Sequence, residues 1–367
     1  MKGYEVKNIE DIDSPALLIY EDRLRANIKE ALRIAGGPER LRPHVKTHKM
    51  AEVVILHLEL GVRKFKCATI AEAEMLALAG ASDVLIAHQP TGPKIHRIVA
   101  LIRHFPSVVF STIVDNEDTA KEISAVCEKA GVVIPLFLDI DTGMHRTGIA
   151  PGETAIKLYR LLDTLPGVSP GGIHAYDGHI RDRDFSVRKE KSDKAFQPVS
   201  QMIETIEGEG GNVPAIIAGG SPTFPVHAQR PDVQLSPGTY VFWDAGYAEM
   251  LPDMNFVPAA LVFTRVVSKP GEGLICLDLG HKALASENPH PRVKLLDIEV
   301  SAFTGHSEEH LVVHTPDAER LKPGDGLYGI PLHICPTVAL YQEAEIVNNG
   351  RAQGRWKVVA RDRKIGV

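Results

Sequence analysis

The first two thirds of the chain alternate between short apolar runs and longer amphipathic runs. Val, Ile, Leu and Phe dominate the short runs, and apolar residues recur every three to four positions in the long ones. The pattern predicts eight strands, at 16–20, 42–46, 64–68, 83–87, 108–113, 134–140, 172–176 and 215–219. It predicts helices at 21–35, 48–60, 70–79, 94–104, 116–130, 152–162 and 187–207, with a short one near Pro222.

Eight strand–helix units of this length predict an α/β protein of the (β/α)₈ TIM barrel type, which usually takes about 250 residues. An open doubly wound sheet is the alternative, because the sequence does not report strand order. From Phe256 the pattern changes to strands separated by Gly, Pro and Asn, at 256–268, 274–279, 293–302, 311–314, 325–330 and 355–360. We therefore predict a barrel of residues 13–247 and a mostly antiparallel β domain of residues 1–12 and 248–367.

The composition excludes several classes of function. A formal net charge of −6 and the absence of a basic block give no reason to expect nucleic acid as a partner. No apolar run approaches the roughly 20 residues of a membrane helix, and the polar start does not resemble a signal peptide. Four widely spaced cysteines are no disulfide framework. We expect a protein of the reducing cytoplasm, with no membrane partner.

In a barrel of this type the functional side chains follow the carboxyl ends of the strands. The second predicted strand ends at His44-Val45-Lys46, and the alternation of side chains places His44 and Lys46 on its inner face. Desolvation there would lower the pKa of a lysine and leave the neutral amine that Schiff-base chemistry needs. The alternative is a lysine that reaches from a strand end into solvent.

Two further strands end in candidate residues. Arg146 follows 134–140 on a glycine-containing turn, and its alternative role is a surface ion pair with Asp139 or Asp141. Tyr176 ends the next strand, and His179 lies just beyond it on a glycine-hinged loop. Histidine is a natural general base near neutral pH, although most loop histidines have no such role.

Two motifs have the chemistry of anion and metal binding. Gly219-Gly220-Ser221-Pro222-Thr223 follows the eighth predicted strand, where barrels often bind phosphate through free backbone N–H groups. Near the end of the chain, His333 and Cys335 point the same way if the segment is extended. An imidazole and a thiolate can ligate zinc, but a packed histidine beside a half-buried cysteine is an equally ordinary arrangement.

These motifs together resemble a known family. Pro43-His44-Val45-Lys46-Thr47-His48-Lys49 is similar to the cofactor-lysine motif of D-threonine aldolases and D-serine dehydratases, whose barrel is of the alanine racemase type. The segments 13–17, 141–146 and 333–338 match the same family in the same order. The resemblance covers nearly the whole chain.

The resemblance implies a role for each candidate residue. Lys46 would carry pyridoxal 5'-phosphate, Gly220, Ser221 and Thr223 would hold its phosphate, Arg146 would lie near its phenolic oxygen, and Tyr176 would line its ring. His333 and Cys335 would bind a divalent metal, which is zinc or else manganese or magnesium. The family also implies a homodimer whose β domain completes the site.

The implied activity is that of a lyase acting on D-β-hydroxy amino acids. In retro-aldol cleavage a base, for which His179 is the candidate, takes the hydroxyl proton, and glycine and an aldehyde leave. In dehydration Lys46 takes the Cα proton, and a 2-oxo acid and ammonia result. We favour the aldolase. A dehydratase is favoured by the sulfur ligand Cys335, and a racemase or a non-catalytic carrier of the cofactor are further alternatives.

Overall fold

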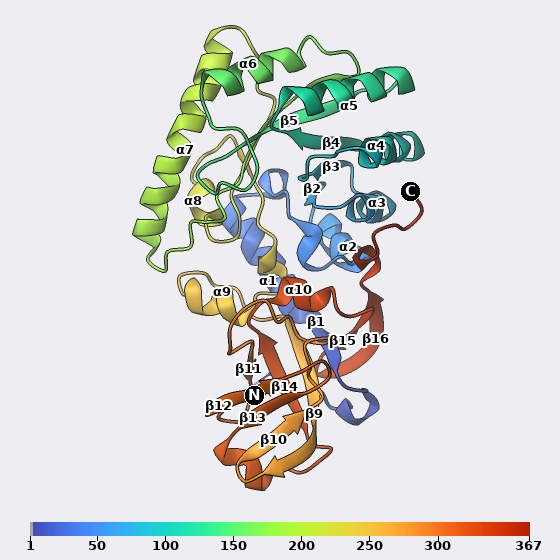
Figure 1. Ribbon diagram of the computed structural model, residues 1–367, viewed down its shortest axis with the longest axis vertical. Coiled ribbons are helices and arrows are strands. Elements are labelled where there is room, and N and C mark those ends of the chain that lie inside the picture. The colour runs from blue at the N-terminus through green and yellow to red at the C-terminus, as the bar shows by residue number, and fades with distance from the viewer. Residues whose placement is uncertain (1–2) are drawn as a thin grey trace. The chain divides into compact units, whose positions relative to one another are not determined.

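The computed structural model describes residues 3–367, which form two compact units. The barrel unit consists of Ala31–Gly238 and Asp362–Val367, and the mixed-sheet unit consists of the chain through Glu30 together with Thr239–Arg361. Figure 1 shows the elements of both units, with the labels used below. Because each unit has its own sheet, each is described by itself.

The barrel unit contains a parallel sheet of seven strands in chain order. The strands are β2 (Lys64–Cys67), β3 (Asp83–Ile86), β4 (Val109–Val114), β5 (Ile134–Ile140), β6 (Val168–Ala175), β7 (Ile216–Ala218) and β8 (Val233–Leu235). Residues 41–44 join the two edge strands, since Leu41 bridges Leu235 of β8 and His44 bridges Lys66 of β2. The ring of eight parallel segments is thereby closed, and the predicted barrel is confirmed.

Helices alternate with these strands along the chain, and Figure 1 shows α3, α4 and α5 beside them. The helices of the barrel unit are α2 (Ala51–Glu59), α3 (Ile70–Leu78), α4 (Pro93–His104), α5 (Glu117–Ala130), α6 (Glu153–Leu162), α7 (Phe185–Gly208) and α8 (Phe224–His227). Side-chain oxygens of Thr69, Asn116 and Asp184 accept backbone N–H groups at the starts of α3, α5 and α7. These caps explain why the helices begin at those residues.

The mixed-sheet unit has nine strands, of which seven follow the order β12-β13-β10-β9-β1-β15-β16, while β14 pairs with β9 and β11. The strands are β1 (Ala16–Tyr20), β9 (Ala260–Gly271), β10 (Leu274–Leu277), β11 (Val293–Leu295), β12 (Ala302–His306), β13 (Leu311–His314), β14 (Gly326–Pro331), β15 (Glu343–Asn348) and β16 (Arg351–Lys357). All of these pairs are antiparallel except β1 with β15. The predicted antiparallel character is confirmed.

The remaining elements are short, apart from the first helix. The α-helices are α1 (Glu21–Ala35), α9 (Ala245–Met250) and α10 (Ile334–Val338). The 3₁₀ turns are η1 (Ile9–Asp11), η2 (Pro38–Arg40), η3 (Val45–Thr47), η4 (Thr239–Val241), η5 (Pro316–Arg320) and η6 (Val359–Arg361).

Two predicted barrel strands differ from the structure. Ala16–Tyr20 is a strand with the predicted bounds, but it lies in the mixed sheet between β9 and β15 rather than in the barrel. Both of its faces are buried there, so its apolar run looks like that of a barrel strand. Arg42–Lys46 is not a regular strand, because the Lys46 N–H bonds His44 Nδ1 and the chain turns into η3.

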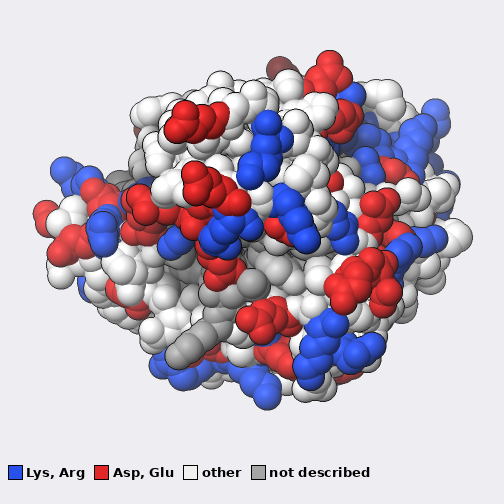
Figure 2. Space-filling model, turned by 90° about the horizontal axis from the view of Figure 1, so that it is seen from below, with Lys and Arg blue, Asp and Glu red and all other residues white. Residues whose placement is uncertain are grey.

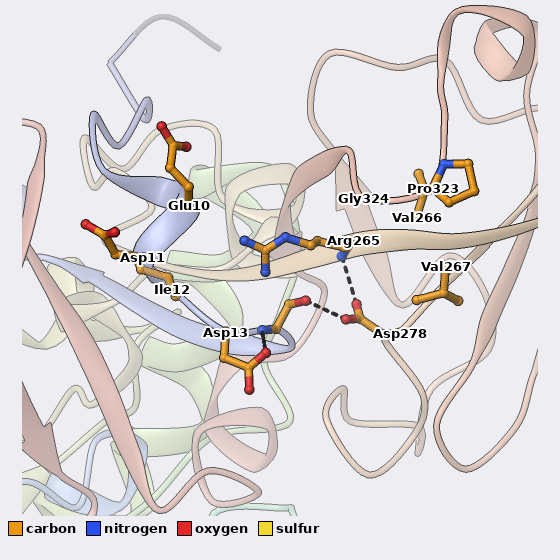
Figure 3. A pocket seen from close by; sticks show the side chains of 11 residues that line it. Glu10, Asp11, Ile12, Asp13, Arg265, Val266, Val267, Asp278, Pro323 and Gly324 are labelled. Carbon is orange, nitrogen blue, oxygen red and sulfur yellow. Dashed lines mark hydrogen bonds between the residues drawn. The ribbon is translucent and has the colours of Figure 1, made fainter.

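Asp278 joins the start of β1 to the neighbouring strand β9 (Figure 3). Its carboxylate accepts hydrogen bonds from the Ser14 hydroxyl at 2.5 Å and the Arg265 N–H at 2.8 Å. It also accepts one from the Thr264 hydroxyl at 2.6 Å. One charged side chain thus ties the residues just before β1 to β9. The hydrophobic core of the same unit includes Val262, Ile275, Val313 and Leu327.

The surface seen in Figure 2 is mixed in charge, and the described helices are too short or too polar to span a membrane. On the face that Figure 2 shows, Lys and Arg side chains are interspersed with Asp and Glu. None of the helices within residues 3–367 has the length and apolar character that crossing a bilayer requires.

Candidate active site

Lys46 lies where the ring-closing segment of the barrel ends. It is the central residue of η3, and the buried His44 before it accepts the Lys46 backbone N–H at 3.3 Å. The Lys46 side chain is half-buried, and its Nζ is 5.9 Å from the centre of the Tyr176 ring. The amine is therefore held over an aromatic side chain at the predicted end of the barrel.

Three cationic side chains, each from a different part of the barrel unit, lie near the Tyr176 ring. Besides Lys46, the Arg146 guanidinium lies 5.2 Å from the ring centre and Lys66 Nζ lies 5.6 Å from it. These residues come from η3, from the turn after β5 and from β2, while Tyr176 follows β6. The structure thus brings together three residues predicted from the sequence, and it adds Lys66, which the sequence analysis did not select.

Glycines leave room for the Tyr176 ring on both sides. A Cβ atom at Gly178 would lie 2.2 Å from Tyr176 Oη, and one at Gly220 would lie 2.8 Å from its Cε2. Gly219 has φ +79°, a conformation that favours glycine. The loop after β7 therefore approaches the ring through backbone atoms, because a side chain at Gly220 would collide with the ring.

Ser221 and Thr223 of this loop are both buried. The Ser221 hydroxyl oxygen accepts the Gly238 N–H at 3.4 Å. The Thr223 hydroxyl donates to Asp177 Oδ1 at 2.6 Å and accepts the Gly220 N–H at 3.3 Å. Since its proton is directed to Asp177, the Thr223 side chain holds the loop in this arrangement.

Asp177 is the centre of a buried network that the sequence analysis did not detect. Its Oδ2 is 2.8 Å from His227 Nε2 and accepts the Ser192 hydroxyl at 3.1 Å. Burial alone would raise the pKa of Asp177, but the charge of His227 and the hydrogen bonds from His227, Thr223 and Ser192 lower it below its ordinary value. The network ties the end of β6, next to Tyr176, to the glycine loop.

Replacing Asp177 with Asn is expected to lower the free energy of unfolding by roughly 2–4 kcal/mol, because the buried partners lose the charge that they were arranged around. Since the folded-state pKa is depressed, this stabilisation is present above the ordinary Asp pKa of about 3.9 and is lost as the pH falls further. Urea titrations at pH 7 and pH 3.5 measure both effects. Asp182→Asn removes only the Lys191 ion pair and should cost within about 1 kcal/mol.

Lys66, His174 and Asp139 form a second buried cluster in the barrel unit. Lys66 Nζ is 3.5 Å from His174 Nε2, and His174 Nδ1 is 2.7 Å from Asp139 Oδ1. Burial and the charge of Lys46 lower the pKa of Lys66 to about 7. The signal in the sequence is a second lysine on the same face of a short strand, two positions after Lys64.

His179 stands apart from this group. Its side chain is exposed, and its imidazole Nε2 would lie 3.4 Å from a Cβ atom at Gly143, in the turn after β5. Within residues 3–367, no hydrogen bond given by the structure joins His179 to Lys46, Arg146 or Tyr176. Its role as a base stays a prediction.

His333 and Cys335 come together in the mixed-sheet unit. The segment is not extended as expected, because α10 begins at Ile334 with His333 as its cap. His333 Nδ1 lies 2.5 Å from Glu287 Oε1, and Thr239 Oγ1 lies 3.6 Å from Cys335 Sγ. Burial lowers the pKa of His333, but hydrogen bonding to Cys335 and Glu287 outweighs it and raises the pKa to about 9.

The residues present fit both groups that the sequence implied. The half-buried amine of Lys46, the ring of Tyr176 and the Arg146 guanidinium near that ring suit an anionic aromatic cofactor. His333 and Cys335 suit a soft divalent metal. Among the described residues no set of three or more His, Cys, Asp and Glu side chains converges, so further positions on a metal would be filled by water or substrate.

Comparison with known proteins identifies the family. Residues 19–245 match the alanine racemase N-terminal domain, and residues 259–347 match a serine dehydratase domain. The chain therefore belongs to the alanine racemase N-terminal domain family, and the relationship predicted from the lysine motif, to D-threonine aldolases and D-serine dehydratases, is confirmed.

Three relatives illustrate the relationship over the full length. The chain is 29% identical to the 3-hydroxy-D-aspartate aldolase of Paracoccus denitrificans (strain Pd 1222), over 98% of this chain and 96% of that protein. It is 26% identical to a D-threonine aldolase of Arthrobacter sp, over 95% and 93%. The crystal structure of the D-threonine aldolase from Filomicrobium marinum is 27% identical and superimposes with a TM-score of 0.88 over 98% of both chains.

Proposed function

We propose that this protein is a pyridoxal-phosphate- and divalent-metal-dependent lyase that cleaves D-β-hydroxy amino acids into glycine and an aldehyde. The observation that carries the proposal is the grouping of the Lys46 amine, the Arg146 guanidinium and the glycine loop around the Tyr176 ring. The relatives named as aldolases, which match over nearly the whole chain, support the same class of reaction.

Each residue of the barrel unit has a distinct task in this proposal. Lys46 attaches the cofactor through its amine, and Tyr176 supports the ring. Arg146 offers a cation to the phenolic oxygen, and Gly220, Ser221 and Thr223 form the loop that receives the phosphate. The cofactor, when bound, supplies the electron sink that makes a bond to Cα breakable.

The remaining roles concern the hydroxyl group of the substrate. His333 and Cys335 hold the metal, which acts as a Lewis acid toward the β-hydroxyl. His179 takes the hydroxyl proton, for which an exposed imidazole on a loop has the access that a general base needs.

Dehydration is the second candidate reaction. Two observations favour it: the match of residues 259–347 to a serine dehydratase domain, and a cysteine at position 335, where an oxygen-donating side chain would favour manganese or magnesium. In that reaction Lys46 removes the Cα proton and the hydroxyl departs as water, and hydrolysis of the unsaturated amino acid that remains gives a 2-oxo acid and ammonia.

One substrate separates the reactions. The purified protein is incubated with pyridoxal phosphate, manganese or zinc, and D-threonine. Acetaldehyde with glycine is the expected result, whereas 2-oxobutanoate with ammonia identifies the dehydratase and an epimer alone identifies a racemase. Binding of the cofactor without turnover of any D-β-hydroxy amino acid would leave the carrier as the function.

We further propose that the protein acts as a homodimer in the cytoplasm. Its two domains follow the described units, so residues 13–30 and 239–247, which the sequence analysis placed in the barrel, belong to the β domain. The kinship supports the dimer, and four cysteines that form no disulfide within the described residues suit a reducing compartment. Light scattering coupled to gel filtration tests the dimer directly.

A further inference from the structure

A buried lysine that the proposed reaction does not use lies beside the candidate site. Lys66 is 2% exposed on β2, and its Nζ is 5.6 Å from the centre of the Tyr176 ring that Lys46 and Arg146 also face. A lysine side chain is rarely buried in this way unless a partner compensates for its desolvation. Lys66 has such a partner in the buried His174.

The partner is an ordered chain of two more side chains. His174 Nδ1 is 2.7 Å from Asp139 Oδ1, and a carboxylate only accepts, so Nδ1 carries the proton of this hydrogen bond. The lone pair of His174 Nε2 is then left to accept from Lys66 Nζ at 3.5 Å. The Thr147 hydroxyl donates to Asp139 Oδ2 at 3.0 Å, which fixes the carboxylate from its other side.

Charged and titratable groups face Lys66 from several elements. They are Arg42, His44, Lys46, Asp139, His174 and Asp177. Arg42 is paired with Asp83 at 2.7 Å, and burial keeps the pKa of His44 well below its ordinary value. Burial and the positive charge of Lys46 lower the pKa of Lys66 to about 7, whereas Asp139 and Asp177 act to raise it.

We propose that Lys66, held in place by His174 and Asp139, compensates for changes of charge on Lys46 and so forms a charge relay within the cofactor-lysine site. Lys66 is a positioning residue in this relay: its Nζ takes a proton from solvent when the charge on Lys46 Nζ falls, and releases it when that charge returns. The summed positive charge of the two lysines near the Tyr176 ring is thereby kept nearly constant. This relay rests on the proposed function, since a change of charge on Lys46 follows from its attachment to a cofactor.

The coupling between the two lysines can be measured without the cofactor. Protein labelled with ¹³C at lysine Cε is titrated by NMR in the apo state, and the Lys66 signal is assigned from its loss in Lys66→Met. We expect a titration midpoint near 7 for Lys66. Lys46→Met should raise this midpoint by roughly one pH unit, and Asp139→Asn should lower it.

The control for these shifts is Lys157→Met, which removes an exposed lysine of α6 from the same unit and should leave the midpoint unchanged. A titration midpoint of Lys66 near the ordinary lysine value of about 10.4 would overturn the relay. A midpoint that is the same in the wild type and in Lys46→Met would overturn it as well. The wild-type and Lys46→Met spectra carry this test even if Asp139→Asn does not fold.

The place of the relay at the cofactor site has a separate readout. The visible absorbance of protein loaded with pyridoxal phosphate is recorded from pH 6 to 9 in the wild type and in Lys66→Met. Both should retain the lysine-bound cofactor, and a spectral change centred near neutral pH should be present only in the wild type. Identical profiles would show that Lys66 is merely structural. If the wild type attaches no cofactor, the proposed function fails, whereas the apo titration still reports whether the relay exists.

Discussion

Lys46→Ala is expected to lower kcat for D-threonine by at least about a thousandfold and to remove the visible absorbance of the lysine-bound cofactor. The reason is chemical rather than structural, because the Lys46 backbone N–H still bonds His44 Nδ1 in the variant and η3 keeps its geometry. The loss is measured in a coupled aldehyde assay and by absorbance. Borohydride reduction of the wild type followed by peptide mapping should place the label on Lys46.

Lys49→Met is the matched comparison, because Lys49 lies three residues away in the same motif. Its ammonium pairs with the fully buried Glu72, which also accepts the Ala68 N–H at 2.6 Å. Removing it should lower the free energy of unfolding by leaving Glu72 without its cation, while the cofactor still attaches. A label found on Lys49 or Lys66 instead of Lys46 would show that our proposal assigns the cofactor to the wrong lysine.

Much of the barrel site could be predicted because it depends on local order along the chain. Lys46, Arg146 and Tyr176 each follow a segment of the barrel ring, and parallel strands deliver their carboxyl ends to one edge. The meeting of these side chains at the Tyr176 ring then follows from topology alone. The glycine loop was predictable for the same reason, since it follows β7.

The remainder depends on contacts between residues distant in sequence. Ala16–Tyr20 could not be assigned to the mixed sheet, because its partners β9 and β15 lie hundreds of residues away. β8 has only three residues and β15 is half-polar, so neither stood out as an apolar run. The Lys66, His174 and Asp139 cluster joins β2, β6 and β5, and no local pattern links a buried lysine to a histidine 108 residues away.

Cys335→Ala is expected to lower the metal content of the purified protein and to reduce kcat by roughly a hundredfold or more, without detaching the cofactor from the barrel unit. Cys335 and His333 are the two predicted protein ligands of the metal, so the loss of the Cys335 side chain leaves His333 as the one that remains. Metal analysis by mass spectrometry and the aldehyde assay, with and without chelator, measure the two effects. Cys276→Ala, in β10 of the same unit, should retain both metal and activity.

The exchange of sulfur for oxygen at this position tests what the thiolate contributes. Cys335→Asp keeps an anionic ligand but replaces a soft donor with a hard one, which favours manganese and magnesium over zinc. Activity restored by manganese in Cys335→Asp, and not in Cys335→Ala, would show that the residue acts by binding the metal rather than by packing against Thr239. Full activity of Cys335→Ala in the presence of a chelator would instead show that the reaction needs no metal. The retro-aldol step would then depend on the base alone.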